Sequence, residues 1–327
     1  MRTSFAIVFA GSGGAGAITA GSSFLQAAAR EGYYGLMTKL SGAQVRGGEA
    51  AALVEIGVSP TEAQPDVFDV LIALDWDNVG KFAPEIPLNA NSLVLADPAA
   101  GAPAPAIVAT GARIVEIPLS KIAASVEGGR VNMVALGAGA ALAGLPMGSV
   151  DAALAGMLAS KGEKAVAASL AAARAGATET AVLGAAPLAP ARKGARWFCS
   201  GNEAVGLGAL RGGVRFVAAY PITPATEITE WLAPRMAAVG GRAMLAEDEI
   251  AAINMALGAS YGGLPSMTVT SGPGLALKVE TIGLAAMAEL PLVIVHVMRV
   301  GPSPGLPPKS APGDLDLVLH GTHGDAT

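Results

Sequence analysis

The 327-residue chain is predicted to fold as an α/β protein with two domains, each built on a mainly parallel sheet. Short apolar strands alternate with helical segments in both halves, which is typical of parallel sheets covered by helices. Residues 184–196 are rich in proline and basic residues and show no apolar periodicity. This composition predicts a linker that separates a domain over residues 1–183 from a domain over residues 197–327.

The first domain begins with an apolar run and a glycine cluster, which favour a buried strand and turn over a secretory signal. Its expected strands are residues 4–9, 50–56, 67–73, 92–96 and 112–117. A helix is expected over residues 16–31, and helical patterning resumes over 132–175. Residues 131–150 are uncharged and long enough to suggest a membrane span, but their Ala and Gly content and Pro146 are poorly suited to lipid. We expect a buried helix pair there.

The second domain repeats the alternation of strands and helices. Its expected strands are residues 214–219, 243–246, 266–270 and 292–297. Its expected helices are residues 202–212, 226–239, 249–261 and 275–287. Because the strands alternate with helices of sufficient length for a crossover, this sheet is also predicted to be parallel.

Composition excludes several classes of function. The net charge of −5 and the lack of basic runs argue against nucleic-acid binding. The single cysteine, Cys199, excludes an internal disulfide framework and any cysteine-bound cluster held by this chain alone. Charged and aromatic residues are scarce, which favours a surface covered in part by a partner protein.

The segment Tyr220-Pro221-Ile222-Thr223-Pro224 follows an expected strand and precedes an expected helix. Each proline fixes its own φ and pushes the residue before it into extended geometry, so Thr223 is held on a stiff loop. Ligands of open α/β sheets bind beyond the carboxyl ends of the strands, where this loop lies. The segment predicts a ligand-binding loop, although an ordinary proline-rich turn is an alternative.

Three acidic residues, Glu247, Asp248 and Glu249, stand at the next junction between a strand and a helix. Carboxylates are favoured at a helix N-terminus, so capping accounts for one or two of them. The remaining carboxylate lies beside a mostly apolar helix and is suited to hydrogen-bond a nitrogen of a ligand.

Two more strand ends carry polar groups. Thr270-Ser271-Gly272-Pro273-Gly274 offers hydroxyls and backbone N–H groups, and Arg299 follows the last expected strand. A guanidinium can bind a carboxylate through two hydrogen bonds, although Arg299 can equally be an ordinary surface residue. Carboxyl ends of parallel strands share one edge of a sheet, so these residues, with Thr223 and Glu249, predict a single site.

A glycine cluster, Gly11, Gly13, Gly14 and Gly16, lies between the first strand and the first helix. Glycines permit a tight turn, and the helix N-terminus offers free N–H groups to a phosphate. An NAD site also needs an acidic residue after the second strand, and residues 33–39 contain none. NAD, another anion and a purely structural turn all stay open.

Arg46 stands beside the glycine pair at residues 47–48. It can present a guanidinium to an anion at the glycine turn or to a partner surface, and a solvated turn is the alternative. No group of residues predicts a metal site held by this chain.

The motifs of the second half resemble those of the 2-oxoacid:ferredoxin (acceptor) oxidoreductases. These thiamine-diphosphate enzymes decarboxylate a 2-oxo acid oxidatively to an acyl-CoA. The segments around Thr223, Glu249 and Ser271 look like successive motifs of the pyrimidine-binding domain of the family's α subunit, 2-oxoglutarate type. Two further segments fit the same domain: Gly201-Asn202-Glu203-Ala204 and Arg299-Val300-Gly301-Pro302-Ser303. The first half, with its glycine cluster and Arg46, resembles the family's γ domain. The resemblance implies a γ-type three-layer α/β domain followed by part of a pyrimidine-type α/β domain.

Carried over by position, the resemblance makes Glu249 the carboxylate that hydrogen-bonds the aminopyrimidine ring of thiamine diphosphate and promotes its imino form. Thr223 and Arg299 would hold the carboxylate and keto group of the substrate. The other cofactor contacts that the resemblance implies are Tyr220, Pro221, Ser271 and Gly272.

The resemblance also implies partners. Mg²⁺, the diphosphate contacts and an iron–sulfur cluster would belong to a separate β subunit, coenzyme A would be a cosubstrate, and ferredoxin or another carrier would accept the electrons. The family's α chain continues past a motif like His323-Gly324-Asp325, which implies that this chain is truncated and active only with its β subunit.

The expected function is therefore that of one subunit of a cytoplasmic, CoA-acylating 2-oxoacid:acceptor oxidoreductase, with 2-oxoglutarate as the expected substrate and without a membrane span. Two alternatives stay open. One is an NAD-dependent dehydrogenase that uses the glycine turn, and the other is a non-catalytic scaffold subunit.

Overall fold

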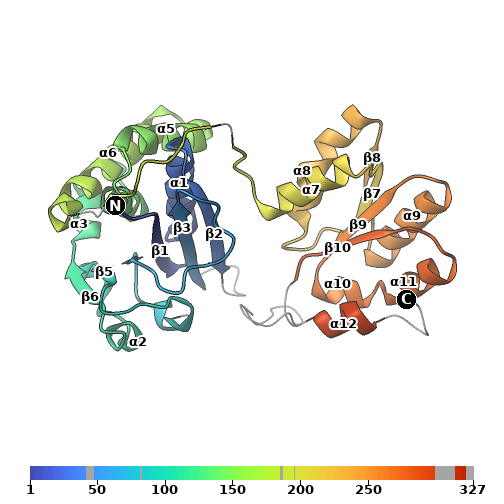
Figure 1. Cartoon of the computed structure of the whole chain (residues 1–327), viewed down its shortest axis with the longest axis horizontal. Helices are drawn as coiled ribbons and strands as arrows, with labels where there is room; N and C mark the ends of the chain where they lie inside the picture. Colours follow the sequence, from blue (N-terminus) through green and yellow to red (C-terminus); the bar gives the residue numbers. More distant parts are fainter. Residues whose placement is uncertain (42–47, 82, 185–186, 195, 299–313, 322–327) are drawn as a thin grey trace. The chain divides into compact units, whose positions relative to one another are not determined.

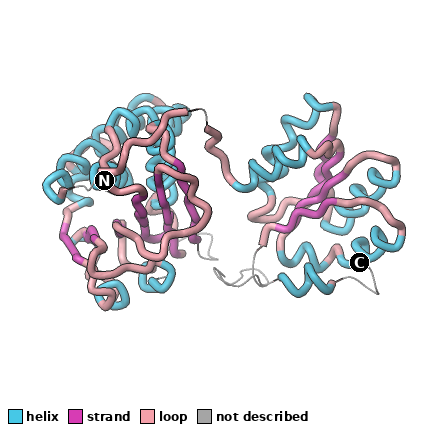
Figure 2. The backbone as a smooth tube through the Cα atoms, viewed as in Figure 1, coloured by secondary structure: helices cyan, strands magenta, loops and turns pink. Residues whose placement is uncertain are grey.

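The structure is a computed structural model and describes residues 1–41, 48–81, 83–184, 187–194, 196–298 and 314–321. It divides into two compact units, Met1–Phe198 and Cys199–Thr327. The linker predicted at residues 184–196 falls in the last part of the first unit. In both units helices flank a central sheet (Figures 1 and 2).

The first unit is built on a six-stranded sheet with the order β2-β3-β1-β4-β5-β6. Its strands are β1 (Ser4–Ser12), β2 (Tyr34–Ser41), β3 (Glu49–Gly57), β4 (Val70–Ala73), β5 (Leu93–Ala96) and β6 (Arg113–Glu116). β1, β4, β5 and β6 pair in parallel, whereas β3 is antiparallel to both of its neighbours. The sheet is mainly parallel, as predicted, with one strand reversed.

The sequence does not predict β2, which lies at one edge of this sheet. Its residues show no alternation of apolar and polar side chains, and most of them are partly exposed. Backbone pairing with β3, from Tyr34 opposite Gly57 to Ser41 opposite Ala50, holds it in place. A strand that depends mainly on backbone pairing leaves little signal in side-chain periodicity.

Alternate residues of β1 bury into the two faces of the sheet. Phe5 and Phe9 pack on Phe24 of helix α1 (Ala17–Arg30), with ring centroids 6.3 and 5.9 Å apart. Ala6 and Val8 enter a second buried cluster on the opposite face. The sheet is therefore the middle layer of three.

Helices form the layer over the first face: α1, α3 (Leu119–Ala124), α4 (Val131–Ala143), α5 (Met147–Leu158) and α6 (Glu163–Thr180). The second face is covered by α2 (Pro105–Val108) and by the 3₁₀ turns η1 (Val79–Lys81) and η2 (Ala83–Glu85). Three further 3₁₀ turns are η3 (Pro98–Ala100), η4 (Ala159–Lys161) and η5 (Ala181–Leu183).

The uncharged segment 131–150 forms α4 and the first part of α5, and nearly all of α4 is buried. The predicted burial is thus confirmed for α4, whereas α5 buries only one side, with Ser149, Val150, Ala153 and Leu154. None of the helices in the described part of the chain has the length and apolar character needed to cross a membrane.

Helices α4 and α6 pack backbone against backbone. A Cβ atom on Gly137 would overlap the carbonyl group of Ala173, and one on Gly176 would overlap that of Val134. The two helices can approach this closely only because both contact positions lack a side chain.

The second unit contains a four-stranded, fully parallel sheet with the order β10-β9-β7-β8. Its strands are β7 (Phe216–Ala219), β8 (Arg242–Leu245), β9 (Ser266–Thr270) and β10 (Val293–His296). Its helices are α7 (Gly201–Arg211), α8 (Thr226–Met236), α9 (Glu249–Tyr261), α10 (Gly272–Ala276), α11 (Val279–Met287) and α12 (Leu315–His320), with the 3₁₀ turn η6 (Ala237–Val239). The single helix predicted at 275–287 is two helices separated by Leu277 and Lys278.

The chain leaves β7 toward β8 and then crosses back to β9 on the other side of β7. Helices α8 and α9 make these two crossovers and lie on opposite faces of the sheet (Figure 1). On the α8 face, Val217 and Ala219 pack against Ile228 and Leu232. In open α/β sheets, ligands bind beyond the carboxyl ends of the strands where the strand order reverses in this way. The topology therefore predicts a ligand site beyond the carboxyl ends of β7 and β9.

We predict that Gly137→Ala lowers the free energy of unfolding by about 3 kcal/mol, because the added methyl group must separate two helices that touch through their backbones. Gly148→Ala in α5 is the matched control, since its Cβ would meet no atom within 4 Å. The control should match the wild type or exceed it by up to about 1 kcal/mol, the gain in helix propensity. Denaturant titrations of both variants check this, and equal stabilities would contradict the packing described.

Candidate functional site

Three of the four residues predicted to share a site follow neighbouring strands of the second sheet. Thr223 follows β7, Glu249 follows β8 and Ser271 follows β9. Because all pairings in this sheet are parallel, the three residues lie at the same edge. The fourth, Arg299, lies outside the described residues, as does Arg46 of the first unit.

The loop that carries Thr223 is held by the side chain of Asn202. The Thr223–Pro224 peptide bond is cis, and Thr223 itself is exposed. Asn202 Nδ2 donates to the carbonyl oxygen of Pro224 at 3.2 Å and to Glu227 Oε2 at 2.9 Å. The exposed side chains of Tyr220 and Pro221 begin the same loop.

Asn202 is a loop-fixing residue whose role the sequence does not reveal. It lies in the first turn of α7, which Ser200 and Glu203 begin with a reciprocal capping box. The segment Ser200-Gly201-Asn202-Glu203 carries the capping signature, but nothing in it indicates that Asn202 reaches the loop after β7.

The three acidic residues at the start of α9 have different surroundings. Glu247 is exposed. Asp248 is the N-cap, and its Oδ1 accepts a hydrogen bond from the Ala251 N–H at 2.7 Å. Glu249 is the first residue of the helix and is half-buried. Capping therefore accounts for Asp248 and leaves the Glu249 carboxylate available.

The Glu249 side chain packs on Gly274 of α10. A Cβ atom on Gly274 would lie 2.9 Å from Glu249 Cγ and 3.0 Å from Oε1, and would overlap Thr270 Oγ1. Ser271 is fully buried, and its Oγ has no hydrogen-bond partner among the described residues. Gly272, beside it, is also buried. The contact brings the ends of β8 and β9 together across the end of β7, which lies between them.

A lysine lies beneath this contact. Lys278 is fully buried, and its Nζ donates to the carbonyl oxygen of Glu249 at 2.7 Å. Burial lowers the pKa of Lys278 to about 8, against the opposing charges of Glu249 and Asp248. The sequence pattern alone does not single out Lys278 as a site residue. The available signal was a single cation within the otherwise apolar segment Gly272–Val279.

Near the Arg299 segment, His296 and Asp314 join the end of β10 to the start of α12. His296 Nε2 and Asp314 Oδ2 are 3.0 Å apart, and the His296 side chain is only 8% exposed. Arg299 follows His296 by three residues in the sequence and lies outside the described residues.

In the first unit, the predicted glycine turn joins β1 to α1. Gly14 and Gly16 have positive φ values of 99° and 90°. Ser12, just before Gly13, is held by Asp75, which accepts from its backbone N and from its Oγ, both at 2.8 Å. Glycine is required at these positions for backbone conformation, and the adjacent Asp75 carboxylate disfavours an anion at the turn.

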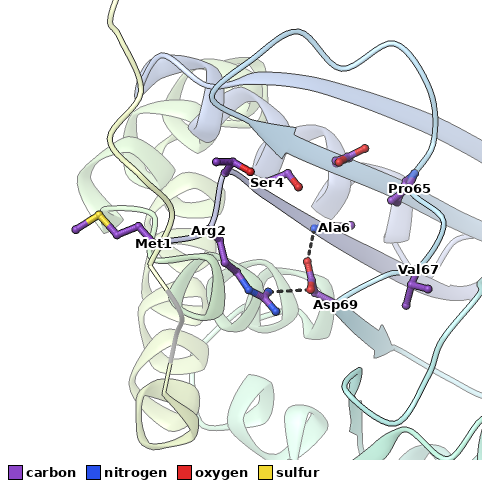
Figure 3. Close-up of a pocket in the computed structure, with 9 residues that line it drawn as sticks. Met1, Arg2, Ser4, Ala6, Pro65, Val67 and Asp69 are labelled. Atoms are coloured by element: carbon purple, nitrogen blue, oxygen red, sulfur yellow. Dashed lines mark hydrogen bonds and ion pairs between the residues drawn. The ribbon is translucent and has the colours of Figure 1, made fainter.

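A cavity of about 410 Å³ opens at the opposite end of β1 (Figure 3). Arg2 Nη1 and Asp69 Oδ1 are 2.8 Å apart in it, and Asp69 Oδ2 accepts from the Ala6 N–H at 2.9 Å. Glu55 also lines the cavity, and its pKa is raised above the ordinary value mainly by burial. A hydrogen bond from Ser4 lowers this pKa, whereas the negative charge of Asp69 raises it further. None of the residues predicted to form a site lines this cavity. Within the described part of the chain, no three His, Cys, Asp or Glu residues are grouped so that they could hold a metal ion.

Each of the two units matches a known protein-family model. Residues 6–179 match the sequence model of the family described as pyruvate ferredoxin/flavodoxin oxidoreductase. Residues 207–323 match the model of the thiamine-diphosphate-binding domain of pyruvate flavodoxin/ferredoxin oxidoreductase.

Curated relatives match part of the chain. The 2-oxoglutarate synthase subunit KorA of Methanocaldococcus jannaschii is 49% identical over 128 residues, which are 39% of this chain and 35% of the relative. The 2-oxoacid:ferredoxin oxidoreductase 1 subunit alpha of Sulfurisphaera tokodaii is 42% identical over 142 residues, which are 40% of this chain and 23% of the relative. The chain therefore spans about a third or less of the length of these relatives.

A solved structure matches the whole chain. It is a 2-oxoglutarate:ferredoxin oxidoreductase from Magnetococcus marinus with 2-oxoglutarate, coenzyme A and succinyl-CoA bound. The match has a TM-score of 0.85 and 37% identity, and it covers 100% of this chain and 57% of the other. Together with the model that matches residues 6–179, more than half of the sequence, this shows that the chain belongs to the pyruvate ferredoxin/flavodoxin oxidoreductase family.

Proposed function

We propose that the chain is part of a CoA-acylating 2-oxoacid:acceptor oxidoreductase, with a γ-type domain over residues 1–183 and part of an α-type domain over residues 197–327. In this proposal the second unit binds the aminopyrimidine ring of thiamine diphosphate. The observation that carries it is the Glu249 carboxylate, which is half-buried at the carboxyl edge of the sheet, packs on Gly274 and makes no hydrogen bond among the described residues. The match of residues 207–323 to a thiamine-diphosphate-binding domain supports it.

The residues at this edge suit an aminopyrimidine. A carboxylate can share a proton with a ring nitrogen, and the buried Ser271 Oγ offers a further hydrogen bond that no described residue uses. Gly274 lets the Glu249 side chain lie flat against α10, since any side chain there would displace it. Tyr220, Pro221 and Gly272 would complete the contacts. Thiamine diphosphate, when bound, supplies the group that stabilises the carbanion formed by decarboxylation.

The remaining residues would act on the substrate. Thr223 is exposed on a braced loop at the same edge and can donate its hydroxyl to the keto or carboxylate oxygen of a 2-oxo acid. Arg299 would bind the carboxylate through two hydrogen bonds. Their task would be to hold the 2-oxo acid so that its keto carbon faces the cofactor.

The net reaction would release CO₂, form a thioester with coenzyme A and pass two electrons to ferredoxin or another acceptor. The substrate we propose is 2-oxoglutarate, because the Magnetococcus marinus structure contains it with coenzyme A and succinyl-CoA. Since coenzyme A is an intracellular cosubstrate, we place the enzyme in the cytoplasm.

A β subunit would hold Mg²⁺, the diphosphate and an iron–sulfur cluster. The single cysteine, which is exposed, supports this division because one thiolate cannot hold a cluster. Leu245, Tyr261 and Met287 of the second unit are 71%, 81% and 80% exposed, which suits a surface covered by a partner. Anion binding by Gly11, Gly13, Gly14, Gly16 and Arg46 stays a prediction.

We predict that Glu249→Ala reduces 2-oxo acid-dependent and CoA-dependent reduction of a viologen dye by a factor of about 100 or more, because the proton shared with the cofactor ring is lost. The assay uses the full-length protein purified with its partner subunit. Glu247→Ala is the matched control, since Glu247 is exposed and adjacent in sequence. Full activity of the Glu249→Ala complex would refute the site.

We predict that Thr223→Val raises the KM for the 2-oxo acid by about tenfold, the effect of losing one hydrogen bond to a charged group. The dissociation constant for thiamine diphosphate should change by less than a factor of two. Steady-state kinetics and cofactor titration measure the two quantities. A change in cofactor affinity without a change in KM would assign Thr223 to the cofactor instead.

We predict that Gly274→Ala reduces the same activity by about tenfold or more, because the new methyl group displaces the Glu249 side chain from its place on α10. Gly258→Ala in α9 is the control, since its Cβ would meet no atom within 4 Å. Both variants should be compared at equal occupancy by thiamine diphosphate. Equal activity would show that the position of Glu249 over Gly274 has no functional importance.

A further inference from the structure

Lys278 stands where a cation is least expected. Its side chain is fully buried, and it lies at the N-cap of α11. Its Nζ contacts the first residue of a second helix, α9. Helix N-termini carry partial positive charge, so two of them, in addition to burial, disfavour the ammonium.

The charges that oppose this cost come from the first turn of α9. Among the described residues, Glu249 and Asp248 are the charged groups that act on Lys278. Asp248 is already the N-cap of α9, and the Glu249 carboxylate is the group assigned to the cofactor. The folded state disfavours the buried ammonium of Lys278, and yet this ammonium bonds the residue that carries the key carboxylate. This combination indicates that Lys278 serves the function of the site.

The backbone around Lys278 is fixed from both sides. Its N–H donates to the carbonyl oxygen of Leu275 at 2.9 Å, and its own carbonyl oxygen accepts from the Ile282 N–H at 3.0 Å. Asn254 Nδ2 of α9 also donates to Thr281 Oγ1 of α11 at 3.2 Å. The corner between α10 and α11 is thus a firm support from which Nζ reaches α9.

We propose that Lys278 is a positioning residue for Glu249: its ammonium holds the first turn of α9 against the α10–α11 corner, so that the Glu249 carboxylate faces the aminopyrimidine ring. The same corner supplies Gly274, on which that carboxylate lies. Lys278 itself touches no ligand, because it is fully buried. This inference rests on the proposed binding of thiamine diphosphate at Glu249.

The decisive variant is Lys278→Met, which keeps the length and apolar stem of the side chain but removes the ammonium. Burial disfavours the ammonium in the folded state, so an apolar side chain of similar length removes an unfavourable charge without leaving a gap. We expect the melting temperature of the cofactor-free complex to be unchanged or higher at pH 7, while the dissociation constant for thiamine diphosphate rises about tenfold. Arg211→Met, which removes an exposed cation from the same unit, is the control and should change neither quantity.

The pH dependence supplies a second readout. The folded-state pKa of Lys278, about 8, lies below its ordinary value of 10.5, so the ammonium loses its proton as pH rises through 8. Between pH 7 and 9 the wild type should therefore lose affinity for thiamine diphosphate, and its advantage over Lys278→Met should shrink. In the same variant the gain in melting temperature should shrink as pH rises from about 8 toward 10.5, because the folded wild-type protein then no longer buries a charge.

A double-mutant cycle with Glu249→Gln tests whether Lys278 acts through Glu249. Lys278→Met should weaken cofactor binding by less than twofold in the Glu249→Gln background. An undiminished effect there, unchanged cofactor affinity of Lys278→Met, or a loss of stability that parallels the loss of affinity would each overturn the inference. If Glu249→Gln alone leaves cofactor affinity unchanged, the proposed function of the site fails as well, so the two failures are distinguishable.

Discussion

The hydrogen bond from Lys278 Nζ to the Glu249 carbonyl oxygen joins the two parts of the fold on which the candidate site depends. One part is α9, which begins at the end of β8, and the other is the α10–α11 corner, which follows β9. β7 lies between these strands, so neither part reaches the other through the sheet. Two contacts connect them: the hydrogen bond from Lys278 to the Glu249 carbonyl oxygen, and the packing of the Glu249 side chain on Gly274. The site is therefore a product of tertiary contacts between helix ends.

The order of the strands explains why such a contact is needed. The chain passes from β7 to β8 and returns to β9 on the other side, so α8 and α9 cover opposite faces. Each helix is anchored to the sheet by its apolar residues, but its first turn lies beyond the sheet and must be fixed separately. Asn202 fixes the loop before α8, and Lys278 with Asp248 fixes the first turn of α9. Polar side chains thus fix the edge that carries the candidate site, whereas apolar contacts define the layers.

The layers were predictable and the bracing contacts were not. Apolar runs such as those of β1, β4 and β5 predict buried strands because they need no information about distant residues. Strand ends then predict where Thr223, Glu249 and Ser271 gather. Edge strand β2 escaped prediction because backbone pairing holds it. Lys278 escaped because its importance depends on a contact across 29 residues of sequence. The family resemblance supplied roles for site residues that periodicity cannot provide, and the places of Arg46 and Arg299 lie outside the described residues.

The glycine contacts between α4 and α6 have a consequence for how this sequence can change over time. Gly137 and Gly176 each face the main chain of the opposite helix. A residue that faces another side chain can be exchanged if its partner changes in compensation, but no substitution alters a carbonyl group. Neither glycine can therefore be replaced by a larger residue unless α4 and α6 move apart. The small, uncharged residues of this segment reflect the distance between two helix axes, a quantity that hydropathy does not measure.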